Sequence, residues 1–258
     1  MRDMTEHDKF KSECAAEIQK QGADGSLKEL TSKWIAKATE HKYSYHFEWL
    51  GRPIIQYPQD IVAMQELIWS IKPDLIIETG IAHGGSLILS ASMLALLDMA
   101  EGTAASPQQS ARRVLGIDID IREHNRDAIE AHPFSGYIKM MQGSSVDAQV
   151  VAEVRTFAKD FKRVLVCLDS NHTHQHVLDE LNAYAPLVSV GSYCVVFDTI
   201  VEDLPKSTYP NRPWGPGDNP KTAARAYLKD HPEFVNDTSI PAKLQVTVAP
   251  DGYLRRLR

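Results

Sequence analysis

Five short apolar runs, separated by segments with helical periodicity, occupy the centre of this 258-residue chain. The runs are DLIIE at 74–78, RVLGID at 113–118, YIKMMQ at 137–142, RVLVCLD at 163–169 and SYCVVFD at 192–198. The segments between them are expected to form helices at 85–99, 122–131, 147–160 and 173–185. Apolar strands that alternate with helices indicate a parallel sheet covered on both faces. The pattern therefore predicts a doubly wound, mostly parallel, Rossmann-like α/β fold with ligands at the carboxyl ends of the strands.

The N-terminal part of the chain is expected to be helical. Helical spacing predicts two helices, at 8–21 and 26–42. The second would carry an apolar stripe made of Leu27, Leu30, Thr31, Trp34 and Ala38. Aromatic residues, a glycine and prolines break the pattern at 43–56, which indicates a structured loop. Residues 1–58 are therefore predicted to form N-terminal helices and a loop that covers the ligand site, in front of an α/β domain at 59–258.

Two further segments complete the predicted domain. Asp60 is expected to cap a helix that ends near Ile71. Its buried face would consist of Ile61, Met64, Leu67, Ile68 and Ile71. At the C-terminus, KLQVTVAPDGYLRRLR predicts two alternating strands joined around PDG. The sheet is thus expected to end in an antiparallel hairpin.

Composition restricts the partners and the compartment. A formal net charge of −6 argues against a nucleic-acid binder, because phosphate neutralisation favours a basic surface. The polar N-terminus has no signal-peptide core, and no apolar run reaches the ~18 residues of a membrane span. Cys14, Cys167 and Cys194 are widely spaced, which indicates neither a disulfide framework nor a CxxC metal site and fits a reducing compartment. A cytoplasmic protein without nucleic-acid or membrane partners is expected.

The turn after the first predicted strand, IIETGIAHGGS, is rich in glycine. Gly80, Gly84 and Gly85 would let the backbone approach a ligand closely, and the following helix would favour a negative group. Glu78 ends the strand where it would repel the pyrophosphate of a dinucleotide. The spacing also departs from GxGxxG. The turn therefore favours a cationic ligand, such as one that carries a sulfonium and an ammonium group.

The next two strand ends add polar groups that suit an adenosine. Asp118 ends the second strand and can accept both ribose hydroxyls. Ser144 and Ser145 follow the third strand, where they would lie beside a purine ring. Each feature alone also fits a tight turn or a helix cap. Together, at consecutive strand ends, they predict binding of S-adenosylmethionine.

Carboxylates end the fourth and fifth predicted strands. Asp169 and Asp198 would meet at one edge of the sheet if these strands are neighbours. Paired carboxylate oxygens suit Mg²⁺ or a similar divalent cation. His172 lies on the turn after Asp169 and could accept a proton near neutral pH, or make only a structural hydrogen bond.

The remaining histidines of LDSNHTHQHVL have a simpler interpretation. Ser170 or Thr173 could cap the helix that follows, which would leave His174 and His176 on its solvated side. His172 and His176 could instead bind zinc, but no third ligand is evident in the sequence.

Four motifs together resemble one protein family. FEWLGRPIIQYPQD, KPDLIIETGIAHGGS, LDSNHTHQHVLDEL and SYCVVFDT are similar to the cephalosporin hydroxylase/rhamnosyl O-methyltransferase family, over residues 43–257. The resemblance implies a class I S-adenosylmethionine methyltransferase fold, similar in outline to catechol O-methyltransferase. It implies the general base of related sugar methyltransferases at His172. The cofactor contacts that it implies are Glu78, Gly80, Ser86, Asp118 and Ser145, and the metal ligands are Asp169 and Asp198.

The sequence departs from this family pattern at the fifth strand end. Metal-dependent relatives commonly carry two adjacent acidic or amide ligands there, whereas this chain has Phe197 before Asp198. Phe197 cannot bind a cation. The metal site has therefore lost a carboxylate, or it has recruited Thr199, Glu202 or water.

The combined prediction is methyl transfer from S-adenosylmethionine to a hydroxyl of a sugar or secondary metabolite, assisted by a divalent cation. Asp169 would act with His172 in catalysis. Residues 43–56 and 199–219, with Tyr209 and Trp214, would close over the site, unless these aromatics serve only as packing anchors. The alternatives are a nicotinamide-dependent oxidoreductase, an oxygenase, and a non-catalytic interaction protein. The apolar stripe of the N-terminal helices predicts a homo-oligomer.

Overall fold

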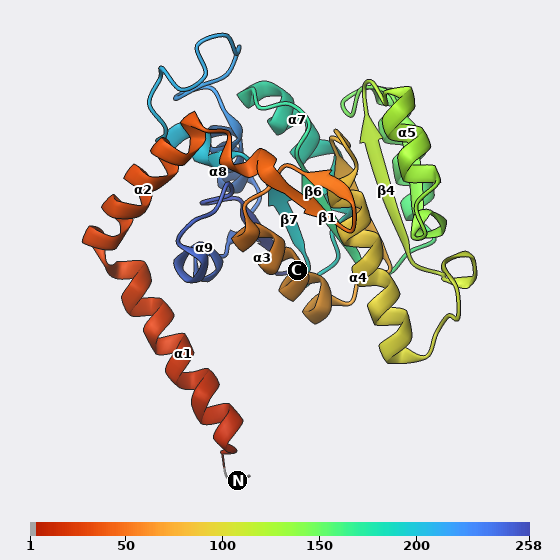
Figure 1. The fold of residues 1–258 in the computed structure, drawn as a ribbon, viewed down its shortest axis with the longest axis horizontal. Coiled ribbons are helices and arrows are strands. Elements are labelled where there is room, and N and C mark those ends of the chain that lie inside the picture. The colour runs from red at the N-terminus through yellow and green to blue at the C-terminus, as the bar shows by residue number, and fades with distance from the viewer. Residues whose placement is uncertain (1–3) are drawn as a thin grey trace.

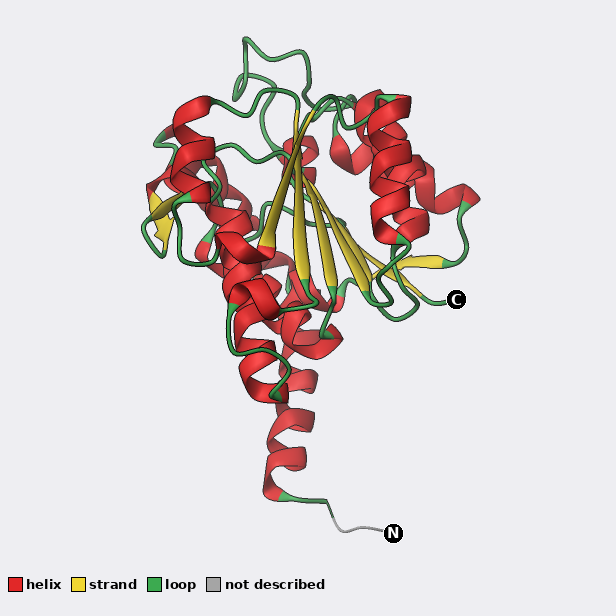
Figure 2. Cartoon of the chain, turned by 90° about the vertical axis from the view of Figure 1, so that its right-hand side faces the viewer, coloured by secondary structure: helices red, strands yellow, loops and turns green. Residues whose placement is uncertain are grey.

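The computed structural model describes residues 4–258, which form a mostly parallel sheet with helices on both faces (Figure 1, Figure 2). Its seven strands lie in the order β5-β4-β3-β6-β7-β9-β8. The strands are β3 (Leu75–Thr79), β4 (Arg113–Asp118), β5 (Ile138–Gln142), β6 (Val164–Leu168), β7 (Tyr193–Val196), β8 (Phe234–Asn236) and β9 (Tyr253–Arg256). Strands β3 to β7 are parallel, whereas β9 pairs antiparallel with β7 and β8. The predicted doubly wound fold is confirmed. Its strand order reverses between β3 and β6, where such sheets bind ligands.

Two groups of helices cover the sheet and bury their apolar residues in two separate cores. The helices are α3 (Pro58–Ile71), α4 (Gly85–Glu101), α5 (Glu123–Glu130), α6 (Ala148–Ala158), α7 (His174–Tyr184) and α8 (Pro220–Asp230). The first three contribute to one core and the last three to the other. Successive strand residues alternate between the cores, so Ile76 lies in the first and Ile77 in the second. Burial on both faces explains why the strands read as continuous apolar runs.

Backbone pairing brings the carboxyl ends of the central strands to one edge of the sheet. The amide of Asp169, just after β6, donates to the Thr79 carbonyl at 2.9 Å. The amide of Phe197, just after β7, donates to the Leu168 carbonyl at 3.0 Å. The polar residues that follow β3, β6 and β7 are therefore held side by side.

The N-terminal helices α1 (Glu6–Ala23) and α2 (Gly25–Glu40) are confirmed, and α1 projects away from the sheet (Figure 1). Gln21 ties α1 to α9 (Ser239–Leu244), because its Nε2 donates to the Ala242 carbonyl at 2.9 Å. Two residues of the predicted α2 stripe are exposed in the single chain. Leu30 is 64% exposed and Trp34 is 42% exposed, whereas Ile35, outside the stripe, is buried. The edge of α2 that faces the body runs through Ile35.

Residues 43–56 form more regular structure than the predicted loop. A short helix η1 (Tyr43–His46) leads into a hairpin of β1 (Phe47–Trp49) and β2 (Arg52–Ile54). Trp49 fixes this hairpin to α4, because its Nε1 donates to Ser92 Oγ at 3.0 Å. The other short 3₁₀ helices are η2 (Pro107–Gln109), η3 (Ser135–Tyr137), η4 (Ala185–Leu187) and η5 (Thr199–Asp203).

Asp60 and the C-terminal segment differ from prediction for one shared reason. Asp60 does not cap α3 but is fully buried in its first turn. Its carboxylate accepts hydrogen bonds from the Val248 amide at 2.9 Å, from the Tyr253 hydroxyl at 3.1 Å and from the Thr247 hydroxyl. These bonds hold 246–249 against α3, so this segment forms no strand. The antiparallel end of the sheet is confirmed, but the strand that pairs with β9 there is β8.

Within residues 4–258, no helix has both the length and the apolar character needed to cross a lipid bilayer.

Candidate active site

The glycine turn after β3 joins two strand ends through backbone contact. Gly80 has φ +88°, in the left-handed region, and a Cβ at this position would lie 2.1 Å from the Asp169 carbonyl oxygen. Gly84 has φ +84°, and a Cβ there would lie 2.4 Å from Ile129 Cδ1. Only glycine fits both positions without displacing neighbours. Gly80 and Gly84 thus approach atoms of the chain itself, and the approach of Gly80, Gly84 and Gly85 to a ligand stays a prediction.

Glu78 is a buried acid at the end of β3. Its carboxylate accepts a hydrogen bond from the Ser86 hydroxyl in the first turn of α4. Burial raises the pKa of Glu78 from 4.5 to about 7, and the bond from Ser86 opposes that rise. No lysine or arginine among residues 4–258 pairs with Glu78, and a buried carboxylate without such a partner favours a positively charged ligand. An ammonium or sulfonium group fits this requirement.

Asp118 lies at the end of β4 and is already engaged with the backbone. Its Oδ2 accepts hydrogen bonds from the amides of Ile81 at 2.8 Å and Ala82 at 3.4 Å, and its Oδ1 accepts one from the Asp120 amide at 3.0 Å. These bonds fix the carboxylate next to the glycine turn. A carboxylate has about four lone-pair sites, so Asp118 can still accept ribose hydroxyls.

Ser144 and Ser145 follow β5 on the same edge of the sheet. Ser144 is partly exposed, whereas Ser145 is buried. The Tyr184 hydroxyl of α7 donates to the Ser145 carbonyl, and Ser145 Oγ lies 3.1 Å from His176 Nε2. The third strand end is therefore attached to α7.

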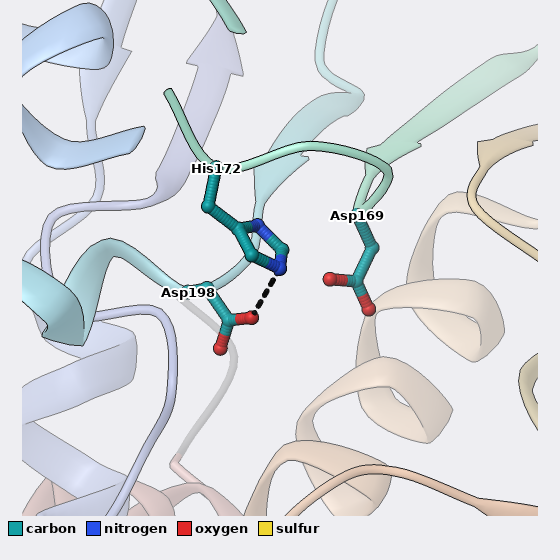
Figure 3. A group of neighbouring side chains, drawn as sticks. All are labelled: Asp169, His172 and Asp198. Carbon is teal, nitrogen blue, oxygen red and sulfur yellow. Dashed lines mark ion pairs between the residues drawn. The ribbon is translucent and has the colours of Figure 1, made fainter. Parts of the chain in front are cut away.

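Asp169, His172 and Asp198 converge from the turns after β6 and β7 (Figure 3). Each offers one ligand atom, and these atoms lie within 4.8 Å of one another. His172 Nε2 lies 3.0 Å from Asp198 Oδ2. Two carboxylates and an imidazole are suitable ligands for a divalent cation. His172 is thus a candidate ligand as well as the predicted base.

The electrostatics of this group fit a cation. Burial raises the pKa of Asp169 well above its ordinary range, and the neighbouring carboxylates of Asp198 and Glu78 raise it further. Positive charge between Asp169 and Asp198 would remove this penalty. Gln56 also contacts the group, because its Nε2 donates to Asp169 Oδ2 at 3.3 Å. The sequence analysis placed Gln56 in the covering loop 43–56 and in the motif FEWLGRPIIQYPQD but assigned it no role, so its contact with Asp169 was missed.

The departure at the fifth strand end is explained by the surrounding packing. Phe197 is buried in the apolar core that contains α3 and α4. Thr199 is also buried and donates to the Pro250 carbonyl. Glu202 accepts hydrogen bonds from the Gly217 amide at 2.7 Å and from Asn219. Neither Thr199 nor Glu202 is therefore recruited to the group of Asp169, His172 and Asp198.

Aromatic side chains from the 199–219 segment lie against His172. The ring of Trp214 contacts the imidazole edge-to-face, with centroids 5.1 Å apart. Tyr209 contacts Trp214 in turn, at 4.7 Å between centroids. The predicted position of Tyr209 and Trp214 next to the site agrees with the structure, which makes Trp214 a neighbour of the candidate base.

The prediction that His174 and His176 face solvent was wrong, because both are partly buried and bonded within the fold. His174 Nδ1 lies 2.8 Å from Thr222 Oγ1 of α8. His176 Nε2 lies 3.2 Å from Ser170 Oγ and faces Ser145. The alternative of a zinc ion held by His172 and His176 also fails, since the two imidazoles face different partners.

Comparison with known proteins identifies the family. The family model described as rhamnosyl O-methyltransferase/CmcI matches residues 41–257. The chain belongs to this family. It is 27% identical over 199 residues to the rhamnosyl O-methyltransferase of Mycobacterium tuberculosis, which covers 76% of this chain and 73% of that protein. The rhamnosyl O-methyltransferase of Mycobacterium leprae is 25% identical over 211 residues, or 81% of this chain and 82% of that protein.

Solved structures of CmcI share the fold. One with magnesium and S-adenosylmethionine has a TM-score of 0.54 and 18% identity, and it covers 83% of this chain and 78% of the CmcI chain. Another, with S-adenosylhomocysteine, has a TM-score of 0.54 and 19% identity over 82% of this chain and 83% of the CmcI chain. Family membership confirms the predicted enzyme class, an S-adenosylmethionine-dependent O-methyltransferase. A nicotinamide-dependent oxidoreductase is not favoured.

Proposed function

We propose that the protein transfers a methyl group from S-adenosylmethionine to a hydroxyl of a rhamnose-like sugar, with the help of a divalent cation. One observation carries the proposal: the Gly80 backbone packs directly on the Asp169 carbonyl. This contact joins the edge formed by Glu78 and Asp118 to the group of Asp169, His172 and Asp198. A methyl donor bound at Glu78 and Asp118 would therefore lie next to an acceptor bound at the second group.

The donor would lie along the ends of β3, β4 and β5. Glu78 would face its cationic methionine end, Asp118 would accept its ribose hydroxyls and Ser145 would contact the purine. Ser86 and Ser144 border the same path. The first turn of α4 begins at Gly84 without a side-chain cap, so its free amides favour the donor carboxylate.

The acceptor hydroxyl would lie beside Asp169 and Asp198. A divalent cation bound there would lower the pKa of the hydroxyl, as metals do for bound water. In the neutral imidazole, His172 Nε2 would carry the hydrogen directed to Asp198 Oδ2 at 3.0 Å, so the hydroxyl proton would go to Nδ1 and Asp198 would stabilise the resulting imidazolium. As the new C–O bond forms, the C–S bond breaks and S-adenosylhomocysteine leaves. Holding oxygen, methyl carbon and sulfur in line supplies much of the rate enhancement.

A sugar acceptor is supported by the relatives and by the aromatic residues. The relatives named rhamnosyl O-methyltransferases cover about three quarters of the chain or more. Trp214 borders His172 and Tyr209 packs on Trp214, and aromatic rings of this kind provide large apolar surfaces for contact with a sugar ring. The segment that carries them would exclude water from the reacting groups.

A methyl-transfer assay tests this proposal. Purified protein is incubated with methyl-labelled S-adenosylmethionine, Mg²⁺ and a small rhamnoside, and the labelled product is separated. We expect labelled methyl ether that depends on Mg²⁺ and disappears with a chelator. A protein that binds neither S-adenosylmethionine nor S-adenosylhomocysteine in a calorimetric titration would contradict the proposal.

We also propose that the protein is a homo-oligomer. Helix α1 buries none of its described residues, and Phe10 on it is 63% exposed. A long helix that buries so little in one chain favours packing against a second copy. Light scattering should give a mass above that of one chain, and Phe10→Glu should lower it. A monomer with α1 intact would contradict this proposal.

A further inference from the structure

Four side chains link the end of β5 to the turn after β6. His176 Nε2 lies 3.1 Å from Ser145 Oγ and 3.2 Å from Ser170 Oγ. Ser170 Oγ donates to Glu180 Oε1 at 2.6 Å. Ser145 follows the strand that borders the proposed purine site, and Ser170 directly follows Asp169. The relay, as we call Ser145, His176, Ser170 and Glu180, thus spans both parts of the active site.

Glu180 determines which atom donates each hydrogen bond at one end of this relay. Its side chain is fully buried in α7. Its second oxygen, Oε2, is buried and has no hydrogen-bond partner among residues 4–258. Ser170 is the hydrogen-bond donor to this buried carboxyl group, so the loss of that bond would cost free energy. The hydroxyl hydrogen of Ser170 is therefore committed to Glu180.

That commitment determines the tautomer of His176. With its hydrogen directed to Glu180, Ser170 Oγ can only accept a hydrogen bond from His176 Nε2. Nε2 must then carry a hydrogen, and three acceptors lie near it: Ser145 Oγ at 3.1 Å, Ser170 Oγ at 3.2 Å and Glu180 Oε1 at 3.6 Å. Ser145 Oγ accepts as well, which leaves its own hydrogen free. No other partner of Ser145 Oγ lies in the described part of the chain.

We propose that Glu180 and His176 orient the Ser145 hydroxyl so that it donates a hydrogen bond to a ring nitrogen of the adenine. The inference rests on the proposed function, because it assumes that the purine of the methyl donor lies beside Ser145. The Tyr184 hydroxyl, which holds the Ser145 carbonyl, fixes the backbone from which this donor projects. Glu180 and His176 are positioning residues, and Ser145 is the group that touches the ligand.

Calorimetric titration with S-adenosylhomocysteine and its 1-deaza, 3-deaza and 7-deaza purine analogues tests the proposal. Each analogue replaces one ring nitrogen by CH and cannot accept there. In the unmodified protein, one analogue should bind about fivefold more weakly than the parent, the effect of one lost hydrogen bond. Ser145→Ala should remove this difference. His176→Phe and Glu180→Met should reduce it to a similar extent, because the Ser145 hydroxyl is then no longer oriented.

His174→Phe is the matched control, since His174 lies on the same helix but contacts Thr222 instead. It should preserve the discrimination between the analogues. A merely structural role of His176 would weaken all ligands equally and leave the discrimination unchanged.

Two results would overturn the inference while the proposed function stands. In one, the unmodified protein binds S-adenosylhomocysteine and all three analogues equally. In the other, His176→Phe still binds the deaza analogue more weakly than S-adenosylhomocysteine, to the same extent as the unmodified protein. This second result does not depend on whether Glu180→Met folds. If the unmodified protein does not bind S-adenosylhomocysteine, both this inference and the proposed function fail.

Discussion

The two ends of the active-site edge are prepared for their ligands in different ways. At the ends of β3, β4 and β5, the polar groups already have partners: Glu78 is bonded to Ser86, Asp118 to backbone amides and Ser145 to His176. At the ends of β6 and β7, Asp169 and Asp198 face each other, and the pKa of Asp169 is raised. Positive charge is favoured at both ends, by Glu78 at the first and by Asp169 at the second, but only the second end places two carboxylates side by side.

Because the two ends differ in this way, we expect substitutions at each end to have different effects. Changes at β6 and β7 should abolish chemistry but leave donor binding largely intact. Changes at β3 and β4 should weaken donor binding directly.

The largest expected effect is that of His172→Gln. Turnover should fall by about 10²–10⁴-fold, the usual contribution of a general base, with unchanged affinity for S-adenosylhomocysteine. Initial rates and calorimetry measure the two quantities. His174→Gln is the control and should retain activity. Full turnover by His172→Gln would show that another group takes the proton.

Asp169→Asn should have the next largest effect. Loss of a carboxylate that would bind the divalent cation directly should weaken cation binding and lower turnover about 100-fold, since substitution of residues that only contact a metal's ligands costs about 10–100-fold. Titration with Mn²⁺ monitored by spin resonance measures the affinity independently of activity. Glu202→Gln serves as the control, because Glu202 binds Gly217 and Asn219 instead. Equal Mn²⁺ affinity in Asp169→Asn would contradict this assignment.

Glu78→Gln should separate ligand affinity from stability. Affinity for S-adenosylhomocysteine should fall about 10- to 100-fold, the effect of one charge-assisted hydrogen bond. Stability of the ligand-free protein should change in the opposite direction. Burial raises the pKa of Glu78 from 4.5 to about 7, so ionisation above this range costs folding free energy.

The pH dependence of unfolding shows whether ionisation of Glu78 raises or lowers the stability of the protein. Between about pH 4.5 and pH 7 the unmodified protein should lose stability through this group, on the order of 3 kcal/mol. Glu78→Gln should lack this loss, so it should be the more stable protein at pH 8 and not at pH 4. Denaturant unfolding at both values measures the difference. A stability difference independent of pH would contradict the role assigned to Glu78.

The smallest expected effect is that of Trp214→Ala. The KM for the sugar acceptor should rise about 2- to 10-fold, the value of one aromatic contact, while donor affinity stays constant. Trp69→Ala, an exposed position on α3, is the control. An unchanged acceptor KM would assign Trp214 to packing alone.

Much of the fold could be predicted from the sequence because burial on both faces of the sheet leaves a local signal. The runs at 74–78 and 163–169, for example, coincide closely with β3 and β6. The predicted parallel sheet also predicts the edge on which the site residues lie, since parallel strands place their carboxyl ends together. The sequence therefore predicts that Asp169 and Asp198 meet at this edge, and they do.

Features that depend on distant contacts could not be predicted. The alternation at 246–249 resembles a strand, but Asp60 draws the segment to α3 through hydrogen bonds to Thr247 and Val248. The bond from Gln56 to Asp169 and the packing of Trp214 on His172 join segments that lie far apart in the chain. No local pattern in the sequence reports such pairs.

A crystal structure with S-adenosylhomocysteine and Mn²⁺ would locate the donor and the cation in one experiment. We expect the donor and the cation to occupy adjacent strand ends, which the contact of Gly80 with the Asp169 carbonyl holds together. We expect the ribose at Asp118, the purine beside Ser145 and an anomalous Mn²⁺ peak between Asp169 and Asp198. A nucleoside bound elsewhere, or an ion that contacts neither Asp169 nor Asp198, would contradict this expectation.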